Sequence, residues 1–292
     1  MQLPPSRQTA RRAAALASVA VLALGAAACG SDAKPTAAEG SSLKQIIGDQ
    51  HAHSLKVDPA DPDALLLGLH GGLYRSTDAG TSWRLVALDG DDAMNVVGGR
   101  EGAPLWVAGH NVLERSRDAG KTFEPVRPEG LPNLDLHGFA VREEDPSEIF
   151  AAAASEGLYR SWDGGGSFEL VSRTVGPSVF GLAAPGDGML LVSDPSQGFL
   201  VSGDGGRSFR MPLRGEGLVS VAIAPGGRGL VVVGGEPGVY LSRDGGRRFE
   251  EGLAKPVAAV AVAPSGPQRV YAVGTDGTFF VSEDGARTWS ER

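Results

Sequence analysis

Cysteine is almost missing from the sequence: Cys29 is the single one among 292 residues. One cysteine cannot form an intramolecular disulfide framework, and it cannot supply a multi-cysteine zinc or iron–sulfur site. Aromatic residues make up only 6% of the chain, and the formal net charge is −8. Because nucleic-acid-binding proteins present a basic face, this charge balance predicts no nucleic-acid partner.

Glycine, in contrast, is abundant, with 43 residues, which is about twice the average usage. The glycines follow no three-residue period, so the chain is not collagen-like. Hydrophobic residues at 41% and charged residues at 21% are typical of a packed globular protein and not of a disordered chain. The length suits one large domain or two ordinary ones.

The first 28 residues have the pattern of a secretory signal peptide. Arg7, Arg11 and Arg12 precede an apolar run over residues 13–28, which is the order of a signal peptide and is too short for a comfortable membrane span. The run ends at Ala26-Ala27-Ala28-Cys29-Gly30, which resembles a bacterial lipobox. The resemblance implies that Cys29 is lipidated and becomes the mature N-terminus.

We therefore expect an exported protein that is lipid-anchored to the cell membrane and faces the periplasm or the outside. The alternative is a soluble secreted protein with Cys29 as a free thiol. Residues 29–43 would contain the lipidated cysteine and a flexible tether, because their composition has no apolar periodicity. Residues 44–292 would form the folded body.

One eight-residue pattern, Ser-x-Asp-x-Gly-x-Thr/Ser-aromatic, occurs six times at spacings of 40 to 45 residues. This pattern resembles the Asp box of BNR-repeat propellers, and the resemblance covers residues 51–292. Two copies depart from it, because Ala286 replaces a glycine and Arg248 replaces a hydroxyl residue. The matching residues are Ser76, Asp78, Gly80 and Trp83; Ser116, Asp118, Gly120 and Phe123; Ser161, Asp163, Gly165 and Phe168; Ser202, Asp204, Gly206 and Phe209; Ser242, Asp244, Gly246 and Phe249; and Ser282, Asp284 and Trp289.

The chemistry of this pattern is structural. The aspartate accepts N–H groups of the residues after it, and the glycine tolerates positive φ. Four short strands per roughly 41 residues are typical of a propeller blade. The sequence thus predicts an all-β, six-bladed β-propeller with an Asp box in each blade. Related propellers include sialidases, sortilin-type ectodomains, photosystem assembly factors and envelope lipoproteins labelled glycosyl hydrolase, so the fold does not decide the function.

Antiparallel strand order places all six Asp boxes on one rim, the lower rim. The turns between second and third strands, and the starts of the first strands, then lie on the opposite rim, which we call the mouth. All five histidines fall there: His51, His53, His70, His110 and His137. Imidazoles gathered in this way form a candidate site for a transition metal such as zinc or copper. Polar residues at loop tips are common, so a solvated rim is the favoured interpretation and metal binding is the alternative hypothesis.

Charged residues at the mouth offer two further hypotheses. Arg127, Arg173 and Arg214 lie in three successive connections between blades, and a group of arginines can hold a carboxylate. Sialidases use an arginine triad in this way together with a tyrosine, but here no tyrosine is expected at the mouth. Glu236 and Asp276, in the mouth turns of adjacent blades, could act as an acid pair for glycoside hydrolysis.

The acidic stretches Asp58–Asp63 and Asp89–Asp92 lack a regular calcium-ligand spacing, so we expect solvated loops. The favoured function is a non-enzymatic extracytoplasmic lipoprotein that binds a protein, a glycan or a metal at its mouth, with no catalytic residue and no cofactor beyond such a metal. The alternative is an exo-acting glycoside hydrolase of the sialidase type.

Overall fold

The computed structural model describes residues 40–292, except for residues 49, 101, 174, 176, 177, 187, 227 and 228. The predicted signal peptide, Cys29 and most of the predicted tether lie outside the described residues, so these assignments stay predictions. Within the described part, none of the helical structure has the length and apolar character needed to span a membrane.

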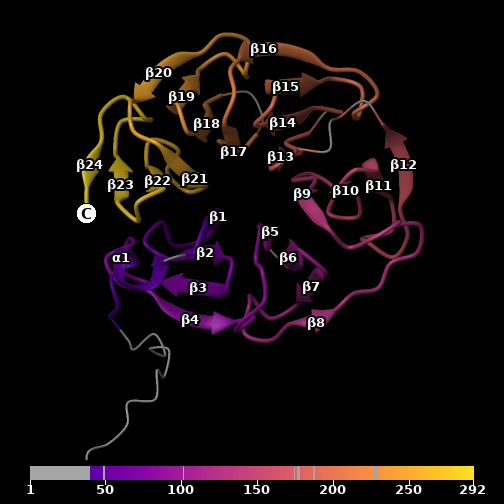
Figure 1. Cartoon of the computed structure of the whole chain (residues 1–292), viewed down its shortest axis with the longest axis horizontal. Helices are drawn as coiled ribbons and strands as arrows, with labels where there is room; N and C mark the ends of the chain where they lie inside the picture. Colours follow the sequence, from indigo (N-terminus) through magenta and orange to yellow (C-terminus); the bar gives the residue numbers. More distant parts are fainter. Residues whose placement is uncertain are drawn as a thin grey trace, which may run out of the picture. The chain divides into compact units, whose positions relative to one another are not determined.

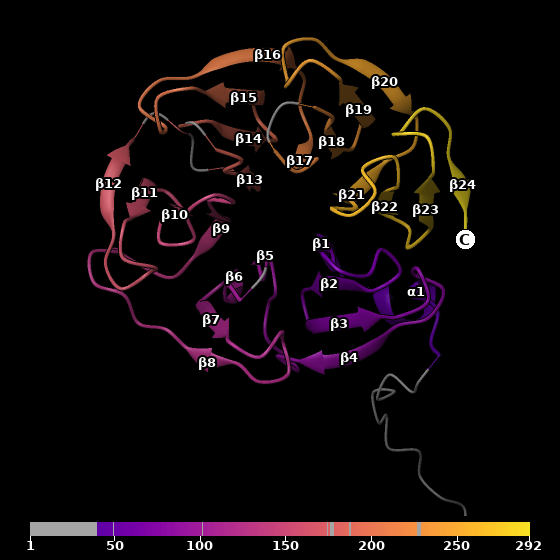
Figure 2. The same ribbon diagram turned by 180° about the vertical axis from the view of Figure 1, so that it is seen from behind.

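The described chain forms six four-stranded antiparallel sheets, each with its strands paired in sequence order. The sheets are arranged as blades in a ring, with the first strand of each nearest the centre and the fourth outermost (Figures 1 and 2). The predicted all-β, six-bladed β-propeller is therefore confirmed.

The strand bounds follow the repeat. Blades one to three are β1 (Ala52–Val57), β2 (Leu65–Leu69), β3 (Gly72–Ser76) and β4 (Arg84–Ala87); β5 (Asn95–Gly98), β6 (Leu105–Gly109), β7 (Val112–Ser116) and β8 (Glu124–Pro125); and β9 (Leu136–Val141), β10 (Ile149–Ala153), β11 (Gly157–Ser161) and β12 (Glu169–Ser172). Blades four to six are β13 (Gly181–Ala183), β14 (Leu190–Asp194), β15 (Gly198–Ser202) and β16 (Arg210–Arg214); β17 (Leu218–Ile223), β18 (Val231–Gly235), β19 (Gly238–Ser242) and β20 (Glu250–Leu253); and β21 (Val257–Val262), β22 (Val270–Gly274), β23 (Phe279–Ser282) and β24 (Ser290–Glu291).

The hydrophobic core is divided into six clusters, and each lies between two neighbouring blades. A strand in the middle of a blade is therefore covered on both faces. This explains why strands such as β18 are buried along their whole length. It also explains why their sequences are continuous apolar runs and do not alternate between apolar and polar residues.

The ring closes without exchange of a strand, because each described sheet is built from one continuous stretch of chain. Side chains join the last blade to the first: Arg269 forms an ion pair with Asp63 at 2.6 Å, and the Tyr271 hydroxyl donates to the Pro62 carbonyl at 2.8 Å. Helix α1 (Leu43–Ile47) adds its buried residues to the cluster between these two blades. The sequence had left the closure open.

Six equivalent turns follow the third strands, where the eight-residue pattern lies; we call them the repeated turns. In the third one, the Ser161 hydroxyl donates to Asp163 Oδ1 and accepts the Gly165 N–H at 2.9 Å. Asp163 in turn accepts the backbone N–H and the hydroxyl of Ser167. In the fifth copy, the Arg248 Nε donates to Asp244 Oδ2 at 3.0 Å, so the guanidinium takes the place of the missing hydroxyl.

Candidate functional site

Four of the five histidines meet at the mouth, the end of the blades opposite the repeated turns. His53 lies in β1 and His137 in β9, whereas His70 and His110 lie in the turns after β2 and β6. Their rings form a chain of contacts, with centroids 5.6 Å apart for His53 and His70, 6.1 Å for His70 and His110, and 5.1 Å for His110 and His137. The predicted gathering of histidines is therefore present in the structure.

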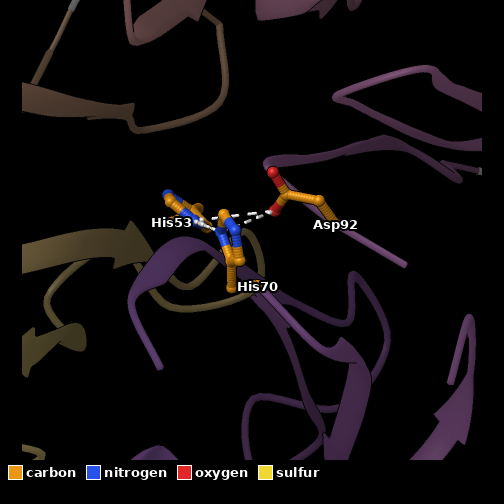
Figure 3. A group of neighbouring side chains, drawn as sticks. All are labelled: His53, His70 and Asp92. Atoms are coloured by element: carbon orange, nitrogen blue, oxygen red, sulfur yellow. Dashed lines mark hydrogen bonds and ion pairs between the residues drawn. The ribbon is translucent and has the colours of Figure 1, made fainter. Parts of the chain in front are cut away.

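Asp92 completes a group of three with His53 and His70, which we call the first triad (Figure 3). The three side chains point toward one another. His53 Nε2 lies 3.3 Å from His70 Nδ1, and each of these nitrogens lies 3.6 Å from Asp92 Oδ1. The three atoms thus form a nearly equilateral triangle of possible metal ligands.

Asp92 is the most buried member of the first triad, with 7% of its surface exposed. Its Oδ1 atom is buried and makes no hydrogen bond among the described residues. An unpartnered buried carboxylate oxygen is costly, so this atom calls for a cation or another donor. The expectation that Asp89–Asp92 is a solvated loop is wrong for Asp92, because the connection from β4 turns this side chain into the mouth.

His110, Asp135 and His137 form a second group, which we call the second triad. His110 Nε2 lies 3.2 Å from His137 Nε2 and 3.5 Å from Asp135 Oδ1, and the last edge, from His137 Nε2 to Asp135 Oδ1, measures 3.1 Å. Asp135 Oδ1 is buried and forms no hydrogen bond among the described residues, although two ring nitrogens lie this close to it.

Asp92 also connects the two triads. Its Oδ1 faces the first triad, while its Oδ2 forms a short hydrogen bond with His110 Nδ1. Because an aspartate oxygen only accepts, His110 carries its proton on Nδ1 in this contact, unless the carboxyl itself is protonated. The Nε2 lone pair of His110 then points into the second triad.

Two residues that the sequence did not single out position these side chains. A Cβ on Gly109 would lie 2.1 Å from the Asp92 carbonyl oxygen, so only glycine lets the turn carrying His110 approach Asp92 so closely. Asn95, 6% exposed, donates to the carbonyl of His137 at 3.3 Å and accepts the Phe139 N–H at 3.2 Å. Asn95 thereby attaches the second blade to the strand that carries His137.

His51 does not join either triad. It is exposed, and its contribution is a backbone carbonyl that accepts the His70 N–H at 3.2 Å. His53 differs sharply, because burial lowers its pKa to about 4, against an opposing effect of Asp92. His53 is therefore neutral at physiological pH, and its Nε2 shares a hydrogen bond with His70 Nδ1.

The three predicted arginines remain separate. Arg173 donates to the Glu156 carbonyl at 3.2 Å, Arg127 donates to the Val126 carbonyl at 3.2 Å, and Arg214 is exposed at the end of β16. No hydrogen bond or ion pair of the described residues joins them to a common acceptor. The arrangement therefore gives no support to a carboxylate clamp.

No hydrogen bond or ion pair among the described residues joins the two members of the predicted acid pair. Glu236 and Asp276 are both exposed in the turns before β19 and β23. Asp276 accepts the Thr278 N–H at 2.9 Å, and the donated hydrogen bonds hold its pKa below the usual range. The Tyr271 hydroxyl is engaged by Pro62 at the other end of the blades.

A separate polar group lies deeper in the central channel, which contains a cavity of about 190 Å³ lined by Lys56, Arg100 and Glu143 among apolar residues. Arg100 forms an ion pair with Glu143 at 3.1 Å. Burial lowers the pKa of Lys56 to about 8 and raises that of Glu143. The sequence had not singled out these residues, because apolar strand residues surround them.

Comparisons with known proteins agree on the fold. No known family model and no curated protein sequence matches this chain. Among solved structures, the GH74 xyloglucanase from Xanthomonas campestris is 21% identical with a TM-score of 0.57 over 88% of this chain and 46% of its own. The GH74 enzyme from Niastella koreensis is 16% identical, with a TM-score of 0.55 over 85% and 47%.

The structure of YCF48 bound to a D1 peptide is also similar, at 16% identity and a TM-score of 0.53 over 82% of this chain and 80% of that one. This chain spans about half the length of the two GH74 chains. At these identities the likeness shows the propeller fold alone.

Proposed function

We propose that this chain is an exported, lipid-anchored propeller of the BNR Asp-box type that binds a divalent transition metal, zinc or copper, at its mouth. The first triad carries the proposal. Two ring nitrogens and a buried, unpartnered Asp92 oxygen converge from β1, the turn after β2 and the next connection between blades.

The spacing of these atoms supports a metal ion. In a tetrahedral zinc site with bonds of about 2.0–2.1 Å, neighbouring ligand atoms lie about 3.3–3.4 Å apart. The edges of the first triad measure 3.3, 3.6 and 3.6 Å. Imidazole nitrogens suit zinc and copper, and the fourth position would be open to water or to a partner.

The residues at the mouth favour a binding function over a glycoside-hydrolase function. A sialidase-type site needs an activated tyrosine and an acid, and the described mouth brings together histidines and aspartates instead. The unidentified protein or glycan partner of the prediction would approach the open metal position. One propeller of this fold, YCF48, is bound to a D1 peptide, which makes a peptide partner reasonable for this proposal.

Metal binding is tested on the full chain, purified in detergent and stripped with a chelator. We expect calorimetry and elemental analysis to show zinc bound with a strong loss of affinity in His53→Gln. His51→Gln is the matched control, because His51 is exposed two residues away and belongs to neither triad. If the wild type takes up neither zinc nor copper, or if both variants bind alike, the proposal is wrong.

Hydrolysis is tested with a panel of fluorogenic glycosides that includes sialosides. We expect no turnover above the buffer rate. Turnover that disappears in Glu236→Gln and survives in Glu251→Gln, an exposed glutamate of β20, would establish the glycoside-hydrolase alternative instead.

The membrane anchor has its own test, which is independent of the metal. Cys29→Ser should move the protein from the membrane fraction to the soluble fraction, because the acylated cysteine is lost. Ser31→Ala, two residues later in the sequence, should leave the partitioning unchanged. Membrane association of Cys29→Ser equal to that of the wild type would exclude lipidation at this residue.

A further inference from the structure

We infer that the second triad is a second transition-metal site and that Asp92 couples it to the first, so that the mouth holds two linked ions. This inference rests on the proposed metal binding at the first triad. It assigns a ligand role to His110, Asp135 and His137.

The geometry of the second triad matches a metal site as closely as that of the first. Its edges of 3.2, 3.5 and 3.1 Å bracket the value of about 3.3–3.4 Å expected between ligand atoms of a tetrahedral zinc. The 3.1 Å edge between His137 Nε2 and Asp135 Oδ1 is not a hydrogen bond, and Asp135 Oδ1 is buried without a hydrogen-bond partner among the described residues. His137 Nε2 makes a hydrogen bond with His110 Nε2 at 3.2 Å, which a metal ion bound by the two nitrogens would replace.

The two triads share two of their three structural positions. Each combines a histidine of the turn after a blade's second strand, His70 or His110, with an aspartate in the connection to the next blade, Asp92 or Asp135. The third ligand comes from a first strand in both cases, but from different blades: His53 lies in the same blade as His70, whereas His137 lies in the blade after the one that carries His110. Repetition of the blade thus repeats two of the three ligand positions, and the two triads have independent ligand atoms.

The coupling follows from the two oxygens of Asp92. Its Oδ1 faces the first triad, while Oδ2 accepts the Nδ1 proton of His110 and so fixes the tautomer that has its lone pair on Nε2, inside the second triad. A carboxylate behind a metal-binding histidine orients the ring and raises its basicity. Asp92 is therefore a ligand of one site and a positioning residue of the other.

The number of bound ions tests the inference directly. Cobalt(II) is titrated into the chelator-stripped full chain, followed by visible absorption, and zinc is counted by elemental analysis. We expect two ions per wild-type chain and one each in His53→Gln and His137→Gln. His51→Gln should still bind two. Because the wild-type count needs no variant, misfolding of a variant cannot hide the answer.

Asp92→Asn tests the coupling. The amide removes a carboxylate ligand from the first triad and replaces an acceptor facing His110, so we expect the affinity of both sites to fall, by about 10–100-fold at the second. The matched control is Asp91→Asn, because Asp91 is the exposed neighbour in the same connection, and it should bind as the wild type does.

The outcomes separate the two proposals. One ion in the wild type, lost in His53→Gln and kept in His137→Gln, overturns the second site and leaves the proposed function intact. No bound ion overturns both proposals. Two ions with unchanged affinity at the second triad in Asp92→Asn overturn the coupling through this carboxylate.

Discussion

On the lower rim, every blade carries the same turn, with a serine hydroxyl, an aspartate and an N–H group joined by the same hydrogen bonds. At the mouth, the equivalent turn positions hold His70, His110, Ser155, Ser196, Glu236 and Asp276. Residues that each blade needs for its own folding are repeated. Where equivalent positions differ, folding does not dictate the residue, and such positions are free to carry ligands.

The largest effect that we predict is a difference in stability between the same substitution made in two of the repeated turns. Gly80 and Gly246 occupy the same position with φ of 86° and 79°. An added Cβ would lie 2.1 Å from the Phe279 ring at Gly80 but 3.5 Å from Phe199 at Gly246. Gly246→Ala should cost about 1–2 kcal/mol for left-handed backbone, and Gly80→Ala about 3 kcal/mol or more, because overpacking adds to it.

Urea unfolding of both glycine variants measures this difference. Phe279 is 1% exposed and belongs to the cluster that joins the first and last blades, so its ring has little room to move away. Equal unfolding midpoints for the two variants would contradict the steric explanation and would restore the equivalence of the turns.

The next largest effect that we predict is stabilisation by zinc, which should depend on the mouth and not on the lower rim. If zinc binds the folded mouth alone, a free concentration a hundred times the Kd adds about 2.7 kcal/mol per site to the free energy of unfolding. This stabilisation by zinc should be smaller in His53→Gln. It should be unchanged in Ser161→Ala, because the effects of distant changes add independently. Thermal melts of each protein with and without zinc measure the stabilisation, and its loss in Ser161→Ala would show that the two rims are not independent.

A smaller difference in stability is expected between two serine-to-alanine substitutions, one on each rim. Ser161, in a repeated turn, is fully buried and accepts the Gly165 N–H, so Ser161→Ala leaves a buried donor unpaired and should cost about 1–3 kcal/mol. Ser155, in a mouth turn, is exposed, and Ser155→Ala should change stability by less than about 0.5 kcal/mol. Urea midpoints compare them; a larger loss for Ser155→Ala would reverse the assignment of the rims.

The fold was predictable from the sequence because its signal is local and repeated. The turn in each blade is formed by residues that are neighbours in the sequence, so the pattern can be recognised directly. Its six copies predict the number of blades, and the strand order predicts the rim on which each turn lies. The closure by Arg269 and Tyr271 was not predictable. These contacts join residues more than two hundred positions apart, and no local pattern encodes the partner.

The candidate site was predictable in part, for a similar reason. Strand order placed the histidines at the mouth, but it does not say how far a connection between blades bends inward. The sequence therefore predicts a solvated loop at Asp92 and does not single out Asp135 or Asn95. One signal was available: Asp92 and Asp135 both follow a turn histidine by 22 to 25 residues, so each histidine has an aspartate in the next connection.

Acid should weaken the lower rim through its aspartates. The N–H and hydroxyl groups of Ser167 and the hydroxyl of Ser161 hold the pKa of Asp163 well below its usual range. In the unfolded protein this carboxyl titrates at about pH 4. As the pH falls below that value, the unfolded state therefore binds more protons than the folded state. Stability from Asp163 is then complete above about pH 4–5 and is lost as the pH falls toward the native pKa.

We therefore expect the urea midpoint of the wild type to decline as the pH falls from 5 to 3. In Asp163→Asn the midpoint should start lower at pH 6 and decline less steeply, because one of the titrating groups is gone. A decline of the same steepness in the two proteins would mean that this aspartate does not contribute to acid unfolding.

The smallest effect tests whether the repeated turns share one backbone. Ala119 and Gly164 occupy the same turn position with φ of 61° and 71°; Ala119 is exposed, and a Cβ on Gly164 would meet nothing within 4 Å. Left-handed backbone costs alanine about 1–2 kcal/mol, and the greater freedom of unfolded glycine offsets about 0.4–1 kcal/mol. Ala119→Gly should therefore stabilise the protein by up to about 1.6 kcal/mol, and Gly164→Ala should destabilise it by a similar amount. Calorimetric melts that shift in the same direction for both variants would show that the two turns differ in backbone strain.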